Sequence, residues 1–199
     1  MLNEEEKKTA LRVARYVLES WIRDKKKPTD IEKKFPITET LKEKRGVFVT
    51  LEVGRQSKKK KLRGCVGYIT GVKSVYKTIA DNAINASTED SRFSPVTAKE
   101  LEKISIEVSV MTPLEVCRPE DIVVGRDGII IQKGFYSGLL LPQVATEYGW
   151  DRIEFLEQTC WKAGLYENAW KEPDTVIKKF SAQVFNEDEY PELYDEKYC

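Results

Sequence analysis

The first part of the chain has apolar residues spaced like one face of an α-helix. Asn3 and Glu6 stand three residues apart, which is the pattern of a capping box at a helix start. The apolar positions that follow recur at helical spacing: Ala10, Leu11, Ala14, Val17, Leu18, Trp21 and Ile22. The Lys-Lys-Lys-Pro run at 25–28 then supplies a cationic last turn and a helix breaker. We expect a helix over 4–24 and a short helix near 39–44.

After residue 45 the pattern changes to the period of two that marks strands. Residues 46–53 and 62–69 are rich in β-branched and aromatic side chains, and the charged stretch between them predicts a hairpin. Ser74 is a candidate helix cap. The helix expected after it has its apolar stripe at Val75, Ile79, Ala83 and Ala86. Residues 104–111 alternate between apolar and polar side chains, so the predicted order is strand, strand, helix, strand.

The second half of the chain repeats this order. Strands are expected at 128–132, 138–144 and 176–185, and a helix is expected to begin at a second capping box, Asp151 with Glu154. The pattern predicts an α+β fold of duplicated β-β-α-β units, with a largely antiparallel sheet, helices packed on it and an extra N-terminal helix. We expect one domain over 1–199, in which the repeats can form two subdomains. The acidic, aromatic tail at 186–199 is interpreted as a surface strap.

Composition narrows the classes of function. Hydrophobic residues make up 41% and charged residues 33%, with no net charge, so we expect a folded protein without an overall basic excess. The chain has no histidine, which excludes Ser-His-Asp catalysis, Cys-His catalysis and His-bound zinc. Its four cysteines form no close pair and are interpreted as separate thiols, and no cofactor or metal site is evident. No signal peptide or membrane-length apolar run is present, so a cytoplasmic protein is expected.

Polar side chains gather on one face of the predicted strands. Arg63 and Cys65 share a face of 62–69, Glu107 and Ser109 lie on the polar face of 104–111, and Gln143 is placed on the matching face of 138–144. Such a face is either the solvated side of a half-buried sheet or a functional site. A cysteine flanked by glycines fits a site, but it also fits a small buried residue. Both interpretations remain open on spacing alone.

The stretch LRGCVGY at 62–68 resembles the LRGC(I/V)G motif of the AMMECR-type domain family, named after a human X-linked contiguous-deletion region. The similarity continues in NAINASTEDSRFSPV, IEVSVMTPLE, VGRDGIII, GLLLPQVATEYGWD and FLEQTCWKAGL, and covers about residues 5–187. One departure is Asp90-Ser91-Arg92-Phe93, where the family commonly has Asp-Pro-Arg-Phe. The resemblance implies a compact α+β fold with duplicated β-α-β elements, but no particular reaction.

The resemblance also implies which positions carry function. The matched motif residues are Arg63, Gly64, Cys65, Gly67, Asp90, Arg92, Glu107, Asp127, Gly128, Pro142 and Gln143. Family members are often encoded or fused with Memo-type and radical-SAM-type proteins, which implies an accessory or catalytic step in a modification pathway. The first hypothesis is therefore a small cysteine-centred enzyme or accessory factor. In it Arg63 favours the thiolate of Cys65, and Glu107 or Asp90 handles protons. Asp90 and Arg92 either pair to hold their loop or present charge to a ligand.

The second hypothesis is a non-catalytic binding or regulatory module for RNA, a nucleotide or a protein partner. Its ligand-binding residues would be Arg92, Gln143 and the lysines of a basic run at 55–63, which are Lys58, Lys59, Lys60 and Lys61. Lysines in a groove bind phosphates. A lysine-rich hairpin tip also keeps a loop soluble and discourages pairing of sheet edges. The sequence alone does not decide whether the protein is an enzyme.

Overall fold

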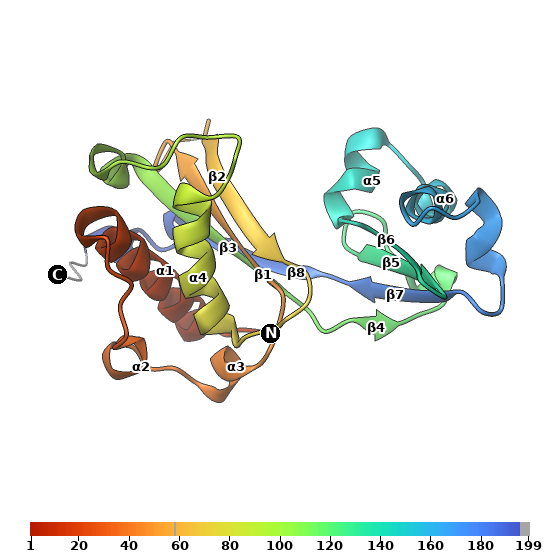
Figure 1. Cartoon of the computed structure of the whole chain (residues 1–199), viewed down its shortest axis with the longest axis horizontal. Coiled ribbons are helices and arrows are strands. Elements are labelled where there is room, and N and C mark those ends of the chain that lie inside the picture. Colours follow the sequence, from red (N-terminus) through yellow and green to blue (C-terminus); the bar gives the residue numbers. More distant parts are fainter. Residues whose placement is uncertain (58, 196–199) are drawn as a thin grey trace. The chain divides into compact units, whose positions relative to one another are not determined.

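The strands form two four-stranded antiparallel sheets, and each sheet belongs to its own unit of the chain (Figure 1). This computed structural model describes residues 1–57 and 59–195. Unit 1 contains Met1–Met111 and the chain from Ala182 onward, and unit 2 contains Thr112–Ser181. Every strand pair in both sheets is antiparallel, so the predicted α+β class is confirmed.

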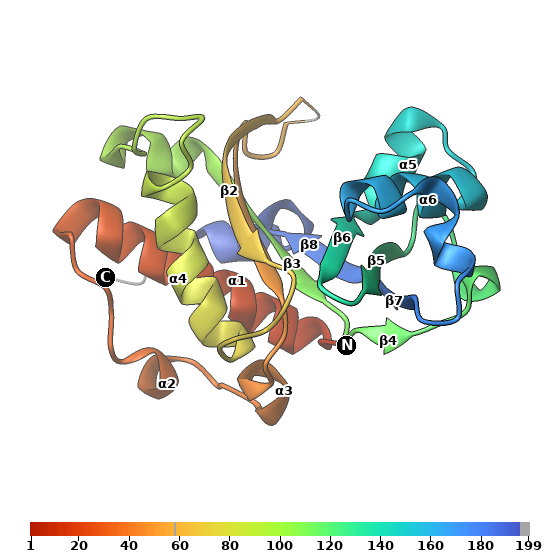
Figure 2. The ribbon, with the colours of Figure 1, turned by 45° about the vertical axis from the view of Figure 1, so that its right-hand side comes forward.

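Unit 1 is a sheet with two long helices packed on one face, as both views show (Figures 1 and 2). Its helices are α1 (Glu4–Asp24), α2 (Ile31–Lys34), α3 (Glu39–Lys42) and α4 (Val75–Thr88). Its strands are β1 (Val47–Val53), β2 (Lys61–Tyr68), β3 (Ile104–Met111) and β8 (Ala182–Asn186), in the order β2-β1-β3-β8. Short 3-10 turns lie at Ala98–Lys103, Glu187–Glu189 and Pro191–Asp195. The core of unit 1 lies between α1, α4 and this sheet.

Local sequence explains α1 and α4. The predicted capping box is present: Asn3 accepts from the Glu6 amide and Glu6 accepts from the Asn3 amide, both at 2.9 Å. Helix α1 ends at Asp24, and its C-cap, Lys25, has a left-handed φ of 54°. Ser74 occupies the N-cap position of α4 but makes no side-chain capping bond. The apolar stripes of both helices are buried against the inner side chains of the strands.

Unit 2 is the smaller sheet with two helices. Its strands are β4 (Glu115–Val116), β5 (Gly128–Lys133), β6 (Tyr136–Leu140) and β7 (Val176–Phe180), in the order β4-β7-β5-β6. Its helices are α5 (Pro142–Tyr148) and α6 (Arg152–Lys162), and 3-10 turns lie at Pro119–Asp121 and Glu167–Lys171. The predicted capping box of Asp151 and Glu154 opens α6, and Gly164, with φ of 77°, follows its end.

The predicted repeat is visible in the strand order of each sheet. In both sheets the first strand of the repeat, β1 or β5, lies in the middle. It pairs on one side with its hairpin partner, β2 or β6, and on the other side with the strand after the helix, β3 or β7. The fourth strand of each sheet follows the other repeat in the sequence: β4 follows β3 but pairs with β7, and β8 follows β7 but pairs with β3. Each repeat is therefore followed in the sequence by a strand that pairs in the sheet of the other repeat.

Three details of the strand prediction are wrong. Residues 138–144 are not one strand, because β6 ends at Leu140 and Pro142 is at the start of α5. Proline suits a first helical turn, where its missing N–H has no partner to lose. Residues 176–185 are two strands in two sheets, interrupted at Ser181. The alternation of β2 also fails at Arg63, as described below.

The described part of the acidic tail is packed into unit 1. Glu187 is buried, and its carboxylate binds the guanidinium of Arg15 on α1, with 2.8 Å from Arg15 Nε to Glu187 Oε1. The carboxylate also accepts from the Ile106 amide at 2.8 Å. Tyr190 and Leu193 are buried too. Within the described residues, no helix is both long enough and apolar enough to cross a membrane.

Candidate functional site

A row of polar side chains crosses the sheet of unit 1 on the face opposite α1 and α4. The strand register pairs Cys65 with Thr50, Thr50 with Glu107, and Glu107 with Asn186. Residues paired directly across antiparallel strands share a face, with Cβ atoms about 5 Å apart. Thr50 alternates with the buried Val49 and Leu51, which places the row on the outer face. These four residues are called the polar row below. The prediction that Cys65 and Glu107 share a face is confirmed.

The thiol of Cys65 is half-buried and has a hydrogen-bonding neighbour. Thr50 Oγ1 donates to Cys65 Sγ at 3.3 Å. Within the described residues, Cys117 is also half-buried and Cys160 is fully buried. Burial raises the pKa of both of these thiols. Among the three cysteines that the structure describes, Cys65 is the one in the polar row. Cys199 lies outside the described residues.

Asp90 and Arg92 lie along the unpaired edge of β2, beside Cys65. Because β2 is an edge strand, the amide of Cys65 has no strand partner on that side, and Asp90 Oδ2 accepts from it at 2.8 Å. Arg92 donates to both oxygens of the same carboxylate, at 2.9 and 2.7 Å. The hydrogen bond from Arg92 is the main reason that the pKa of Asp90 lies far below its ordinary value. The sequence left two roles open for Asp90 and Arg92, which were to hold their loop or to present charge to a ligand. In the structure the two side chains bind each other and hold the loop.

Arg92 is also held next to Cys65, because the Asp90 carboxylate that it binds accepts from the Cys65 amide. The hydrogen bond to Asp90 raises the pKa of Arg92. The guanidinium of Arg92 is exposed, so it remains accessible to solutes while it is bound to Asp90. The structure therefore brings Cys65, Asp90 and Arg92 together at one edge of the sheet.

Arg63 does not take the predicted position beside the thiol. The register of β2 shifts between Gly64, which pairs with Leu51, and Leu62, which pairs with Glu52, so Arg63 is the unpaired residue of a β-bulge. Its guanidinium donates to Glu100 at 2.7 Å and to the main-chain oxygen of Ser94 at 2.9 Å. The hydrogen bond from Arg63 lowers the pKa of Glu100 to about 2. Arg63 thus secures the segment that follows α4.

Glu107 has an environment that disfavours its charge. Burial raises the pKa of its carboxyl, and the nearby Glu52 carboxylate adds to the effect. Lys60 acts in the opposite direction but does not cancel it. A carboxyl with a raised pKa is a better proton acceptor and donor near neutral pH than an exposed one.

Replacing Glu107 with Gln is expected to stabilise the protein at pH 7 and to have little effect at pH 4. Because the pKa of Glu107 is raised in the folded state, its favourable contribution is present below the ordinary pKa of 4.5 and is lost as the pH rises through the raised value. Gln has no charge to bury. Urea midpoints of both proteins at the two pH values measure the effect. Glu102→Gln, on an exposed side chain, is the control. An equal change at both pH values would contradict the burial argument.

The basic loop is partly neutralised by acidic residues. Lys60 lies 3.2 Å from a Glu52 oxygen and also binds the Asp188 carboxylate. Lys59 and Lys61 are exposed, and Lys58 lies outside the described residues. Of the predicted phosphate-binding lysines, Lys60 therefore already has carboxylate partners.

Four of the matched motif residues belong to unit 2: Asp127, Gly128, Pro142 and Gln143. Gln143 is exposed on α5 and not on a strand, so the predicted face for it is wrong. Asp127 is buried and accepts from the Val123 amide at 2.9 Å and from Arg126, which fits a loop-forming carboxylate. In residues 1–57 and 59–195, no group of three Cys, Asp or Glu side chains has the arrangement of a metal site.

Sequence reasoning missed Thr50, the residue that contacts the thiol. The predicted hairpin of 46–53 and 62–69 contained the needed signal, because pairing its two strands brings a residue of the first strand opposite Cys65. Choosing Thr50 required the register, which depends on the bulge at Arg63. The role of Arg92 beside the thiol had no such signal, since it depends on a loop that follows α4.

Comparison with known proteins agrees with the motif resemblance. The family model described as AMMECR1 matches residues 11–185. Protein TK0174 of Thermococcus kodakarensis is 46% identical over 187 residues, covering 91% of this chain and 89% of its own. A Methanothermobacter thermautotrophicus protein is 45% identical over 197 residues, covering 94% and 97%. The crystal structure of the uncharacterized protein PH0010 from Pyrococcus horikoshii superposes with a TM-score of 0.67 at 42% identity, covering 92% and 91%. The chain belongs to the AMMECR1 family.

Proposed function

We propose that this protein is a cysteine-centred enzyme or accessory factor whose reactive group is Cys65. The observation that carries the proposal is the hydrogen bond from Thr50 to the sulfur, in a polar row that also contains Glu107, whose carboxyl has a raised pKa. A hydroxyl that donates to sulfur, and a cation near it, both favour negative charge on that sulfur. We assign the role expected of Arg63 to Arg92, which Asp90 holds next to Cys65.

In this proposal each residue has a separate role. Cys65 attacks an electrophilic substrate, and Glu107 exchanges protons with a substrate that lies across the polar row. Asp90 is a positioning residue, because both of its oxygens already accept hydrogen bonds from Arg92 and one also accepts from the Cys65 amide. Gly64 and Gly67 are backbone-geometry residues: a Cβ at either would overlap neighbouring atoms.

The alternative, binding of RNA through the basic loop, has less support. Lys60 has two carboxylate partners, and the chain has no net charge. Pathway context supports the first proposal, since the family resemblance implies Memo-type and radical-SAM-type partners. Co-purification with the tagged protein as bait tests these partners. If neither type of protein is recovered, the pathway is removed from the proposal. The chemistry of Cys65 is tested separately, by the labelling experiment that follows.

Replacing Thr50 with Val is expected to slow alkylation of Cys65 by iodoacetamide about fivefold, because a hydrogen bond of this kind contributes ~1 kcal/mol. Valine keeps the branched shape that suits a strand. Peptide mass spectrometry after timed labelling gives the rate for each cysteine. Thr146→Val, whose hydroxyl donates to a main-chain oxygen in unit 2, is the matched control. If Thr50→Val and Thr146→Val both label at the wild-type rate, the hydroxyl does not assist the thiol and the proposed site loses its main support.

A further inference from the structure

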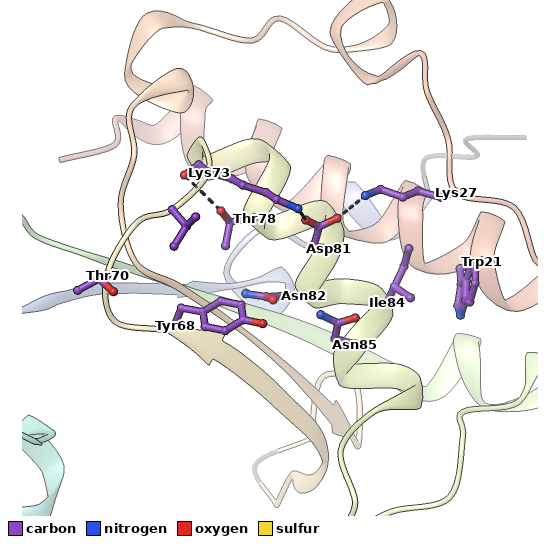
Figure 3. Close-up of a pocket in the computed structure, with 11 residues that line it drawn as sticks. Trp21, Lys27, Tyr68, Thr70, Lys73, Thr78, Asp81, Asn82, Ile84 and Asn85 are labelled. Carbon is purple, nitrogen blue, oxygen red and sulfur yellow. Dashed lines mark hydrogen bonds and ion pairs between the residues drawn. The ribbon is translucent and has the colours of Figure 1, made fainter.

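A cavity of about 630 Å³ lies in unit 1 beside α4, and none of the residues of the polar row lines it. Its walls come from α1, from the segment after α1, from the end of β2 with the following loop, and from α4 (Figure 3). Pockets for small molecules are typically about 300–1,000 Å³ in volume. The size of this cavity, called the α4 cavity below, suits a small-molecule ligand.

Asn82 gives the α4 cavity a buried acceptor without a donor. This side chain is fully buried, and its Nδ2 donates to the main-chain oxygen of Val47 at 3.0 Å, which sets the orientation of the amide. No group of the described residues donates to its Oδ1. Figure 3 shows this oxygen on the side of the amide toward Asn85. A buried acceptor without a donor costs about 1–3 kcal/mol, and a ligand N–H would remove that cost.

Further groups of the cavity wall suit a flat ring with a polar edge. Asn85 lies one helical turn after Asn82 and carries a second amide, which both donates and accepts. Tyr68 is 55% exposed, so its ring is available to stack on a planar ligand. Trp21 lines the same cavity, and its buried indole N–H has no acceptor among the described residues. Amide pairs and aromatic faces are the groups by which proteins bind nucleobases.

The remaining wall carries an excess of positive charge. Lys27 and Lys73 both bind the single carboxylate of Asp81, the second at a distance of 2.7 Å (Figure 3). Two ammonium groups and one carboxylate leave one positive charge, which suits a phosphate group. Both lysine side chains are about half exposed, so an anion can reach them.

From these groups we propose that the α4 cavity binds a nucleoside monophosphate. The base lies on Tyr68 with an exocyclic amine donating to Asn82 Oδ1 and its ring acceptor facing Asn85. The phosphate lies at Lys27 and Lys73. This proposal does not depend on the role of Cys65, because the cavity and the polar row share no residue.

Isothermal titration calorimetry with AMP, GMP, CMP and UMP tests the proposal on the full chain. At least one of AMP, GMP and CMP, whose bases carry an exocyclic amine, is expected to bind with a Kd below about 1 mM. Inorganic phosphate and the corresponding nucleoside are each expected to bind at least about tenfold more weakly, because each makes only part of the contacts. Absence of binding by AMP, GMP and CMP would overturn the proposal. Equal affinity for phosphate alone would overturn it too, since the base would then contribute nothing.

Variants test whether the α4 cavity is the site. Lys73→Gln and Asn85→Ala are each expected to weaken binding about tenfold, the effect of losing one charged or buried hydrogen bond. Lys42→Gln removes an exposed lysine that pairs with Glu39 at 2.8 Å and is expected to leave the affinity unchanged. Alanine favours the helix at position 85, so the fold of that variant is retained, and circular dichroism confirms this. If all three variants bind as the wild type does, the nucleotide binds elsewhere and the assignment of this cavity is wrong.

A second matched pair tests the stacking role of the aromatic ring. Tyr68→Ala is expected to weaken nucleotide binding about tenfold, because stacking of a base on an aromatic ring contributes ~1–3 kcal/mol. Tyr136→Ala removes a tyrosine of similar exposure, 58% against 55%, in unit 2. It is expected to change nothing. Equal affinity of both variants and the wild type would contradict stacking of the base on Tyr68.

Discussion

Replacing Glu187 with Gln is expected to lower the free energy of unfolding by about 3–5 kcal/mol, because it leaves the guanidinium of Arg15 buried without its counter-charge. Arg15 is 3% exposed and Glu187 is 1% exposed. Arg15 also donates to the main-chain oxygens of Leu101 and Ile104, at 3.2 and 2.8 Å. The pair therefore joins α1 to β3 and to the segment after β8. For a chain of this size, the expected fall in Tm is about 10 °C.

Two further variants separate the buried charge from the loss of a contact. Arg15→Met combined with Glu187→Leu removes both charges and is expected to recover most of the lost stability. Glu39→Gln removes one partner of the exposed pair with Lys42 and is expected to cost less than about 1 kcal/mol. Urea denaturation of the four proteins gives the values. If Glu187→Gln lowers the free energy of unfolding no more than Glu39→Gln does, the buried pair does not stabilise unit 1.

Replacing Gly64 with Ala is expected to destabilise the protein by about 3 kcal/mol, the upper part of the usual range for overpacking. A Cβ at Gly64 would lie 2.0 Å from the main-chain oxygen of Ala86 in α4. A main-chain atom cannot rotate away as a side chain can, so β2 and α4 must move apart. Because Cys65 is the next residue, the same change also displaces the thiol from Thr50.

Gly134→Ala is the control for this second prediction. Gly134 has φ of 57°, and no atom lies within 4 Å of its Cβ position, so the substitution has a backbone cost of about 1 kcal/mol and no overlap. Urea denaturation compares the two variants. A loss of stability in Gly64→Ala that does not exceed that in Gly134→Ala would show that β2 and α4 tolerate a larger separation.

The elements predicted correctly are those whose signals are local. The capping boxes at Asn3 and Asp151 and the apolar periods after them depend on residues within a few positions of one another, and α1 and α6 begin where they predict. The alternation of 104–111 likewise gives β3 with the predicted ends. The segment 138–144 was ambiguous because a short apolar run fits a strand or a helix equally well. Pro142 was the available sign of a helix start.

The exchange of strands between the two sheets had no local signal. Residues 176–185 have a pattern compatible with one strand, and only the partners of each half show that β7 and β8 belong to different sheets. Ser181 marks the change: its amide donates to Thr112 Oγ1, and the Thr112 amide donates to its main-chain oxygen. Partners that lie about seventy positions away in the sequence cannot be deduced from hydrophobic period alone.

The candidate site was predictable in part. Strand alternation placed Cys65 and Glu107 on one face, and the structure agrees. It placed Arg63 there as well, but a bulge interrupts the alternation and directs that guanidinium to Glu100. Asn82 carried an overlooked signal, because it lies three residues after Ile79 on the buried stripe of α4, where an amide needs partners.

The most direct test of the central claim is the alkylation of the native wild-type protein at pH 7, measured separately for each cysteine-containing peptide. The comparison is with Cys117 and Cys160, whose environments raise the pKa of the thiol. Iodoacetamide is expected to modify Cys65 at least about tenfold faster than either, because Thr50 donates to its sulfur and Asp90 holds Arg92 next to it. Modification of Cys65 at the same rate as Cys117, or more slowly, would contradict the claim that this thiol is the reactive centre.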